Sequence, residues 1–123
     1  MLKDSTLKVW GLKNCDTCKK ATKWLDAENI DYEFLDIRNP TPDQATLKHW
    51  LSEAGDKILI NRRSTSWRNL SDEQKNSTTE QQFLTLITEN PTLIKRPVFV
   101  KHSVKQDEKT QITVGFNAKN PPF

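Results

Sequence analysis

The sequence contains few cysteines, no long apolar run and no large excess of charge of one sign. Its 123 residues hold two cysteines, and its longest apolar runs, such as PVFV, are far shorter than the roughly 20 residues of a membrane-spanning helix. The opening stretch MLKDSTLKVW is polar, and its apolar run is too short for a signal peptide. We therefore expect a cytoplasmic protein with no membrane partner, where a cysteine pair is redox-active or metal-binding more often than structural.

The charge balance argues against direct binding of nucleic acid. Nineteen basic and 16 acidic side chains give a net charge of +3, and the basic residues are spread along the chain. This excess is too small to indicate direct nucleic-acid binding. The composition, 34% hydrophobic and 28% charged, is typical of a globular protein. With no repeat and no low-complexity linker, the sequence predicts one domain over residues 1–123.

The first third of the chain predicts a βαβ unit. Leu7, Val9 and Gly11 alternate along a strand at residues 6–12, and residues 31–37 alternate in the same way. Between them, apolar residues recur at helical spacing from Asp16 to about Asn29. A strand, a helix and a strand in about 30 residues indicate a parallel pair of strands joined by a helix.

The remaining chain predicts helices followed by a hairpin. A helix at residues 41–55 is expected to start with a capping box from Thr41 to Gln44 and to end at Gly55. Residues 58–70 predict a loop or short helical turns, and residues 77–90 a helix with a capping box from Ser77 to Glu80. Apolar strands at 97–100 and 111–116 flank a polar turn at 101–110, and the proline-rich end at 117–123 is not expected to be helical. The prediction is an α/β fold with a sheet of about four strands.

Both cysteines lie where the first strand passes into the first helix, in GLKNCDTCKKA. The free N–H groups and the positive end of the helix dipole favour an anion at Cys15, so its pKa should fall below the free value of about 8.5. Lys13, Lys19 and Lys20 add positive charge, while Asp16 subtracts some. Cys18, one turn further along, is placed to attack a mixed disulfide on Cys15, but the same position also suits simple core packing.

Other uses of the cysteine pair are disfavoured. Zinc needs four ligands, and the other candidates, His49 and His102, lie at spacings that match no common zinc motif. A purely structural disulfide across so short a loop is unusual in the cytoplasm. The sequence therefore predicts no metal site and no tightly bound cofactor.

Three motifs together resemble one family. They are WGLKNCDTCKKATKWL, LINRRSTSWRNL and PTLIKRPVFVK, and they extend over about residues 7–116 in this order. They resemble the arsenate reductase-like family, which includes ArsC, Spx with MgsR, and YffB, and they look most similar to the YffB branch. The resemblance implies a thioredoxin-like mixed four-stranded sheet, βαβ plus ββ, with a helical insertion between the halves.

The resemblance also implies roles for particular residues. Cys15 would be the nucleophilic thiol, and Arg96 would precede a cis-proline, Pro97, and hold negative charge beside the thiolate. Arg63, more than Arg62 or Arg68, would help to bind an oxyanion or substrate, together with Pro97 and with Asn14, which directly precedes the nucleophile.

Two functions are implied by the branches of the family. One is a thiol-dependent reductase in which glutathione, acting as a co-substrate, or Cys18 resolves the adduct on Cys15, with electrons from glutathione or a glutaredoxin- or thioredoxin-type donor. The alternative is an Spx-like regulator that binds RNA polymerase and senses disulfide stress through its CxxC.

Overall fold

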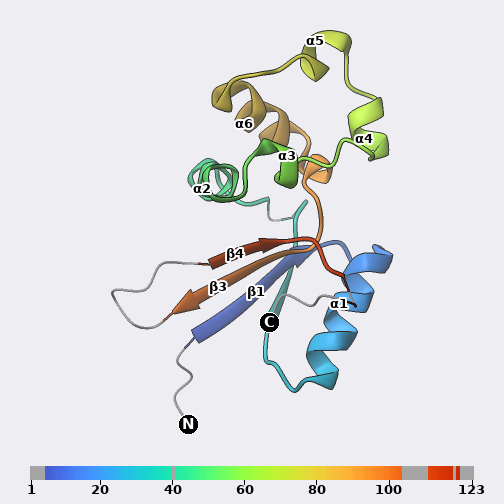
Figure 1. Cartoon of the computed structure of the whole chain (residues 1–123), viewed down its shortest axis with the longest axis vertical. Coiled ribbons are helices and arrows are strands. Elements are labelled where there is room, and N and C mark those ends of the chain that lie inside the picture. Colours follow the sequence, from blue (N-terminus) through green and yellow to red (C-terminus); the bar gives the residue numbers. More distant parts are fainter. Residues whose placement is uncertain (1–4, 40, 104–110, 118, 120–123) are drawn as a thin grey trace. The chain divides into compact units, whose positions relative to one another are not determined.

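The computed structural model describes residues 5–39, 41–103, 111–117 and 119. The chain forms two compact units: one combines the chain up to Asp36 with the chain from Arg96 onward, and the other is Ile37–Lys95 (Figure 1). The prediction of one domain over residues 1–123 stays a prediction. In the described ranges, no helix combines the length and the apolar character needed to cross a membrane.

The first unit is a four-stranded mixed sheet with one helix, α1. Its elements are β1 (Ser5–Gly11), α1 (Asp16–Ala27), β2 (Glu33–Asp36), β3 (Val98–Ser103) and β4 (Gln111–Val114). The strand order is β2-β1-β3-β4; β1 and β2 are parallel, and the other two pairs are antiparallel. This topology confirms the predicted βαβ and ββ halves.

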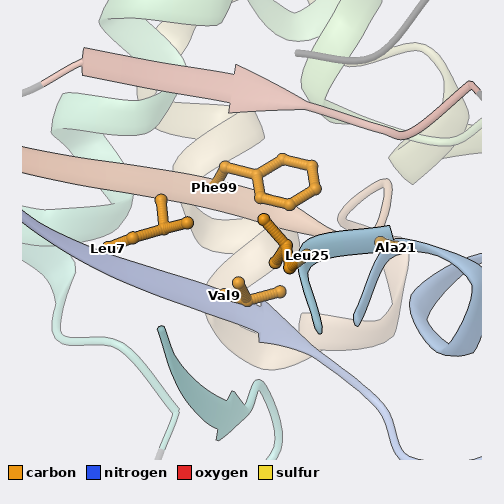
Figure 2. Close-up of a cluster of buried hydrophobic side chains, with 5 residues drawn as sticks. All are labelled: Leu7, Val9, Ala21, Leu25 and Phe99. Atoms are coloured by element: carbon orange, nitrogen blue, oxygen red, sulfur yellow. The ribbon is translucent and has the colours of Figure 1, made fainter. Parts of the chain in front are cut away.

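Alternating side chains of the sheet form the core against α1. Figure 2 shows five buried side chains from β1, α1 and β3: Leu7, Val9, Ala21, Leu25 and Phe99. Leu7 and Val9 share a face of β1 because strand side chains alternate, and Ala21 and Leu25 share a face of α1 because they are four residues apart. This packing fixes α1, and hence its N-terminal end, against the sheet.

The second unit is helical. It contains α2 (Gln44–Ala54), α3 (Asp56–Leu59), α4 (Thr65–Arg68), α5 (Asp72–Lys75), α6 (Glu80–Glu89) and the 3-10 helix η1 (Pro91–Leu93). Helix α2 contacts α3 and α6, and η1 contacts α4 and α6. A bridge between Ile60 and Ile94, both buried, joins the residue after α3 to the residue after η1. The polar stretch 58–70 is thus built mainly of short helical turns, as predicted.

The predicted start of the helix at residues 41–55 is wrong by two residues. The N-cap of α2 is Asp43, whose carboxylate accepts a hydrogen bond from the Thr46 N–H at 2.8 Å. The Thr41 hydroxyl instead donates to the Arg38 carbonyl at 3.0 Å. Both Thr41 and Asp43 are residue types that cap helices, and the sequence pattern alone favoured Thr41. Gly55 ends α2 with φ 82°, as predicted.

The second predicted capping box is also displaced by two residues. The Thr79 hydroxyl accepts from the Gln82 N–H at 3.1 Å, and the Gln82 side chain accepts from the Thr79 N–H at 3.0 Å. Ser77 is not the cap, because its hydroxyl donates to the Gln74 carbonyl at the end of α5. In the predicted turn at 101–110, residues 104–110 lie outside the described residues, as do residues 118 and 120–123 of the predicted non-helical end.

Candidate active site

Cys15 is the residue at which the chain leaves the sheet and enters α1. It is the N-cap residue of α1, with φ −91° and ψ 122°, and its side chain is partly buried. Its backbone N–H donates to the Leu12 carbonyl at 3.2 Å, and its carbonyl accepts from the Lys19 N–H at 2.9 Å. The sulfur therefore lies at the end of the helix where unpaired N–H groups converge.

The pKa of Cys15 is lowered from its usual range. Burial raises this pKa, but the backbone N–H and the thiol of Cys18, together with the hydrogen bonding and positive charge of Arg96, lower it by more. The Cys15 side chain makes no regular cap hydrogen bond, yet these groups favour its thiolate. The direction agrees with the sequence expectation, although the stabilising groups are Cys18 and Arg96 and not the lysines.

The pKa of Cys18 is shifted in the opposite direction. Its side chain is only 2% exposed, and burial, reinforced by the nearby Cys15, raises the pKa of its thiol to about 12. It thus stays protonated at neutral pH and donates its proton toward the Cys15 sulfur. Both cysteines are free thiols in the structure. The two sulfurs are therefore unequal, because the pKa of the Cys15 thiol is lowered and that of the Cys18 thiol is raised.

Gly11 makes room for the Cys18 sulfur. A Cβ atom at this position would lie 2.5 Å from the Cys18 Sγ and 3.6 Å from a ring carbon of Phe34. Since real Cβ atoms do not approach sulfur so closely, any other residue at the end of β1 would displace the thiol. A glycine within a strand pattern often marks such a close approach, which is the signal that would have identified Gly11 from the sequence.

Arg96 and Pro97 begin the return of the chain into the sheet. The Arg96–Pro97 peptide bond is cis, Pro97 is buried, and its carbonyl accepts from the Gly115 N–H at 2.8 Å. Arg96 is partly buried, with its Nε atom shielded from solvent. This placement brings a permanent positive charge to Cys15 from a distant part of the sequence.

The structure brings three of the predicted site residues together: Cys15, Cys18 and Arg96. Asn14 immediately precedes Cys15 and is exposed. Arg63 belongs to the helical unit and is exposed, with its N–H donating to the Asn61 side chain at 3.1 Å. The catalytic role of the first three, and the anion-binding roles of Asn14, Arg63 and Pro97, stay predictions.

The helical unit distinguishes the two arginines of the Asn61–Arg62–Arg63 motif. Arg62 makes an ion pair with Asp56 at 3.0 Å, and its guanidinium lies 5.1 Å from the ring centre of Trp67. These contacts with a carboxylate and an aromatic ring use the Arg62 guanidinium within its own unit. Arg63 remains the better candidate of the pair for binding an anion.

A metal centre finds no support among the described side chains. No three His, Cys, Asp or Glu residues gather there at distances suited to a metal ion. His49, one of the two histidines considered as ligands, is exposed on α2, and the side chain of His102 lies outside the described residues. The site described so far consists only of thiols and a guanidinium.

This arrangement suits nucleophilic attack by sulfur. Hydrogen-bond donors and a cation lower the pKa of Cys15 and so favour its thiolate, which is the attacking species in thiol chemistry. A second thiol at the i+3 position is within one helical turn of the first. The guanidinium also provides planar donors for a carboxylate or an oxyanion.

Comparisons with known proteins agree with this fold and motif pattern. The ArsC family matches residues 10–120. An uncharacterized protein of Haemophilus influenzae is 45% identical over 111 residues, 90% of this chain and 91% of that protein. The global transcriptional regulator Spx 2 of Bacillus cereus is 31% identical over 106 residues, 85% of this chain and 75% of that protein.

A solved structure, described as a YFFB protein, superposes with a TM-score of 0.79 at 34% identity. The match covers 91% of this chain and 92% of that chain. The mixed sheet is therefore the thioredoxin-like sheet that the three motifs predicted. With a family match over most of its length and relatives above 30% identity, the chain belongs to the ArsC family.

Proposed function

We propose that this protein is a thiol-dependent oxidoreductase of the cytoplasm in which Cys15 is the nucleophile. The observation that supports the proposal most is the stabilisation of the Cys15 thiolate by Cys18 and Arg96. Membership of an arsenate reductase-like family favours the same class of chemistry. The substrate is an oxidised sulfur compound or an oxyanion.

With a disulfide substrate, the first step is an exchange at sulfur. The Cys15 thiolate attacks one sulfur of the substrate, the substrate S–S bond breaks, and a Cys15 mixed disulfide forms. The other half of the substrate leaves as a thiolate and takes a proton from solvent. Arg96 binds negative charge on the substrate next to the reacting sulfur.

The second step regenerates the Cys15 sulfur by one of two routes. In the first, the thiolate of one glutathione attacks the mixed disulfide, the substrate leaves as a thiol, and a Cys15–glutathione disulfide remains; a second glutathione attacks this disulfide, frees the Cys15 thiolate and leaves as glutathione disulfide. In the second, Cys18 loses its proton to solvent and attacks the Cys15 sulfur. The bond from Cys15 to the substrate sulfur breaks, the substrate leaves as a thiol, and the resulting Cys15–Cys18 disulfide is then reduced by a glutaredoxin- or thioredoxin-type dithiol. Each route transfers two electrons to the substrate disulfide.

Mass spectrometry combined with turnover tests the proposal and separates the routes. The reduced parent and the variants Cys15→Ser and Cys18→Ser are incubated with hydroxyethyl disulfide and glutathione. We expect the parent to consume the disulfide and Cys15→Ser to be inactive. A Cys18→Ser variant that keeps its turnover indicates the glutathione route, and one that accumulates a Cys15 adduct indicates the dithiol route.

The pH dependence of alkylation gives an independent check. Iodoacetamide should modify Cys15 with an apparent pKa below the free-thiol value of about 8.5. A value at or above 8.5, or equal turnover by Cys15→Ser and the parent, would contradict the proposed role of Cys15.

A redox-sensing regulator is the second candidate function. The CxxC and the similarity to a global transcriptional regulator favour it, and the partner would be RNA polymerase. Capture of the RNA polymerase α subunit by the oxidised protein only, without turnover of thiol substrates, would support this function over the reductase.

A further inference from the structure

A pocket of about 270 Å³ lies beside α1 and overlaps the residues of the proposed thiol chemistry only at Cys18. Seven residues from the end of β1, from α1 and from the second half of the βαβ unit line it: Leu12, Lys13, Cys18, Lys19, Thr22, Tyr32 and Phe34. Neither Cys15 nor Arg96 is among them. Cys18 is therefore the one residue that the pocket shares with the thiolate site.

The floor of the pocket is apolar. The Cys18 sulfur and the Phe34 ring both lie close to the place where a Cβ atom of residue 11 would stand, so the glycine leaves room for them. Leu12 adds a partly buried aliphatic side chain. A buried, protonated thiol behaves as a small apolar group, and so this floor suits a ring or a branched alkyl group.

The rim of the pocket is positively charged. Lys13 and Lys19 are exposed at their positions in the lining, and Thr22 and Tyr32 contribute hydroxyl groups. One carboxylate, Asp26, interacts with the Tyr32 hydroxyl but does not line the pocket. Two ammonium groups over an apolar floor, with no acidic residue in the lining, complement a ligand that has an anionic end and an apolar body.

We propose that this pocket is a non-covalent binding site for a small carboxylate with an aromatic or branched apolar body. The body lies on Phe34, Leu12 and the Cys18 sulfur, and the carboxylate pairs with Lys13 and Lys19. The volume is below the usual range of about 300–1,000 Å³ for drug-sized ligands, so the ligand is small. Binding is non-covalent because the Cys18 thiol keeps its proton at neutral pH.

Titration with 3-phenylpropionate, followed by backbone amide chemical shifts, tests the site. We expect saturating shifts centred on Lys13, Lys19, Tyr32 and Phe34. Replacing both rim lysines with methionine should weaken binding about fivefold, as expected for partly solvated ion pairs. The double variant Lys20→Met with Lys23→Met removes the same charge from exposed positions outside the lining and should bind like the parent.

Two further measurements complete the test. The neutral analogue 3-phenylpropanol should bind the parent about as weakly as the acid binds the rim variant. The Cys15→Ser variant should bind the acid as tightly as the parent, because Cys15 does not line the pocket. The binding result is thus independent of whether the protein is a reductase.

Three outcomes would overturn the proposal. They are the lack of a saturable response in the millimolar range, shifts centred on Cys15 and Arg96, and equal weakening by the rim and control variants. The second would mean that the anion binds at the thiolate site, and the third that the effect is one of net charge only.

Discussion

Gly11→Ala is the change that most directly tests the packing beneath the two thiols. The new Cβ would lie 2.5 Å from the Cys18 Sγ, so the sulfur must move by about 1 Å to reach the 3.4 to 4 Å of an ordinary contact. Cys18 is buried, so that movement disturbs the contacts that its side chain makes. Overpacking of this kind costs about 1–3 kcal/mol of unfolding free energy.

The same substitution in a Cys18→Ala background should be tolerated. Without the sulfur, the nearest atoms are the residue 18 Cβ at 3.5 Å and a Phe34 ring carbon at 3.6 Å, which are ordinary contacts. Gly11 does not have the positive φ seen at Gly55 and Gly115, so alanine meets no backbone strain there. Replacing a glycine that needs no special conformation stabilises a protein by about 0.4–1 kcal/mol.

The four proteins of this double-mutant cycle separate the packing of the sulfur from every other effect. Guanidinium-induced unfolding of the parent, the two single variants and the double variant should give a coupling free energy of about 2 kcal/mol. Iodoacetamide alkylation of the Gly11→Ala variant should also show a raised Cys15 pKa, because the displaced thiol donates less well. An equal cost of Gly11→Ala in both backgrounds would refute the reasoning.

Three further predictions follow from individual contacts. Arg96→Gln should raise the pKa of Cys15 in alkylation assays, whereas Lys95→Gln, at its exposed neighbour, should not; equal shifts would assign the effect to net charge. Burial raises the pKa of Cys18 to about 12 in the folded protein, so on raising the pH this thiol ionises in the unfolded chain before it ionises in the folded protein. The parent should therefore lose stability relative to Cys18→Ala as the pH rises above about 9, by up to about 1.4 kcal/mol per pH unit. Parallel curves of unfolding free energy against pH for the two proteins would contradict this assignment. Thr79→Ala should destabilise the protein by about 1 kcal/mol in thermal unfolding, and Thr78→Ala by less than about 0.5 kcal/mol; a larger loss at Thr78 would mean that the cap of α6 has been misassigned.

The strands and main helices were predictable because their patterns are strong and local. Leu7 and Val9 alternate on β1, and Phe83 and Ile87 recur on α6, and all four are buried. Helix starts were less predictable, because polar residues that can cap cluster before α2 and α6. The cap that forms depends on where neighbouring hydroxyls find other partners, as Thr41 does at Arg38 and Ser77 at Gln74.

The candidate site was predictable in its residue types and in the lowered pKa of Cys15, but not in the causes of that shift or in the raised pKa of Cys18. The CxxC and the late Arg-Pro indicated Cys15, Cys18 and Arg96 from the sequence. The raised pKa of Cys18 depends mainly on its burial, and the effect of Arg96 on Cys15 depends on a contact between sequence-distant groups, so no local pattern encodes either. The space at Gly11 likewise depends on how α1 packs on β1.

The raised pKa of Cys18 sets the order in which the two cysteines react in the proposed mechanism. While Cys15 carries its charge, that charge helps to keep Cys18 protonated. Once Cys15 is bonded to a substrate sulfur, the charge disappears, and one cause of the raised Cys18 pKa disappears with it. In the proposed dithiol route, therefore, Cys15 reacts first, and Cys18 becomes more acidic only after Cys15 has formed its bond to the substrate sulfur.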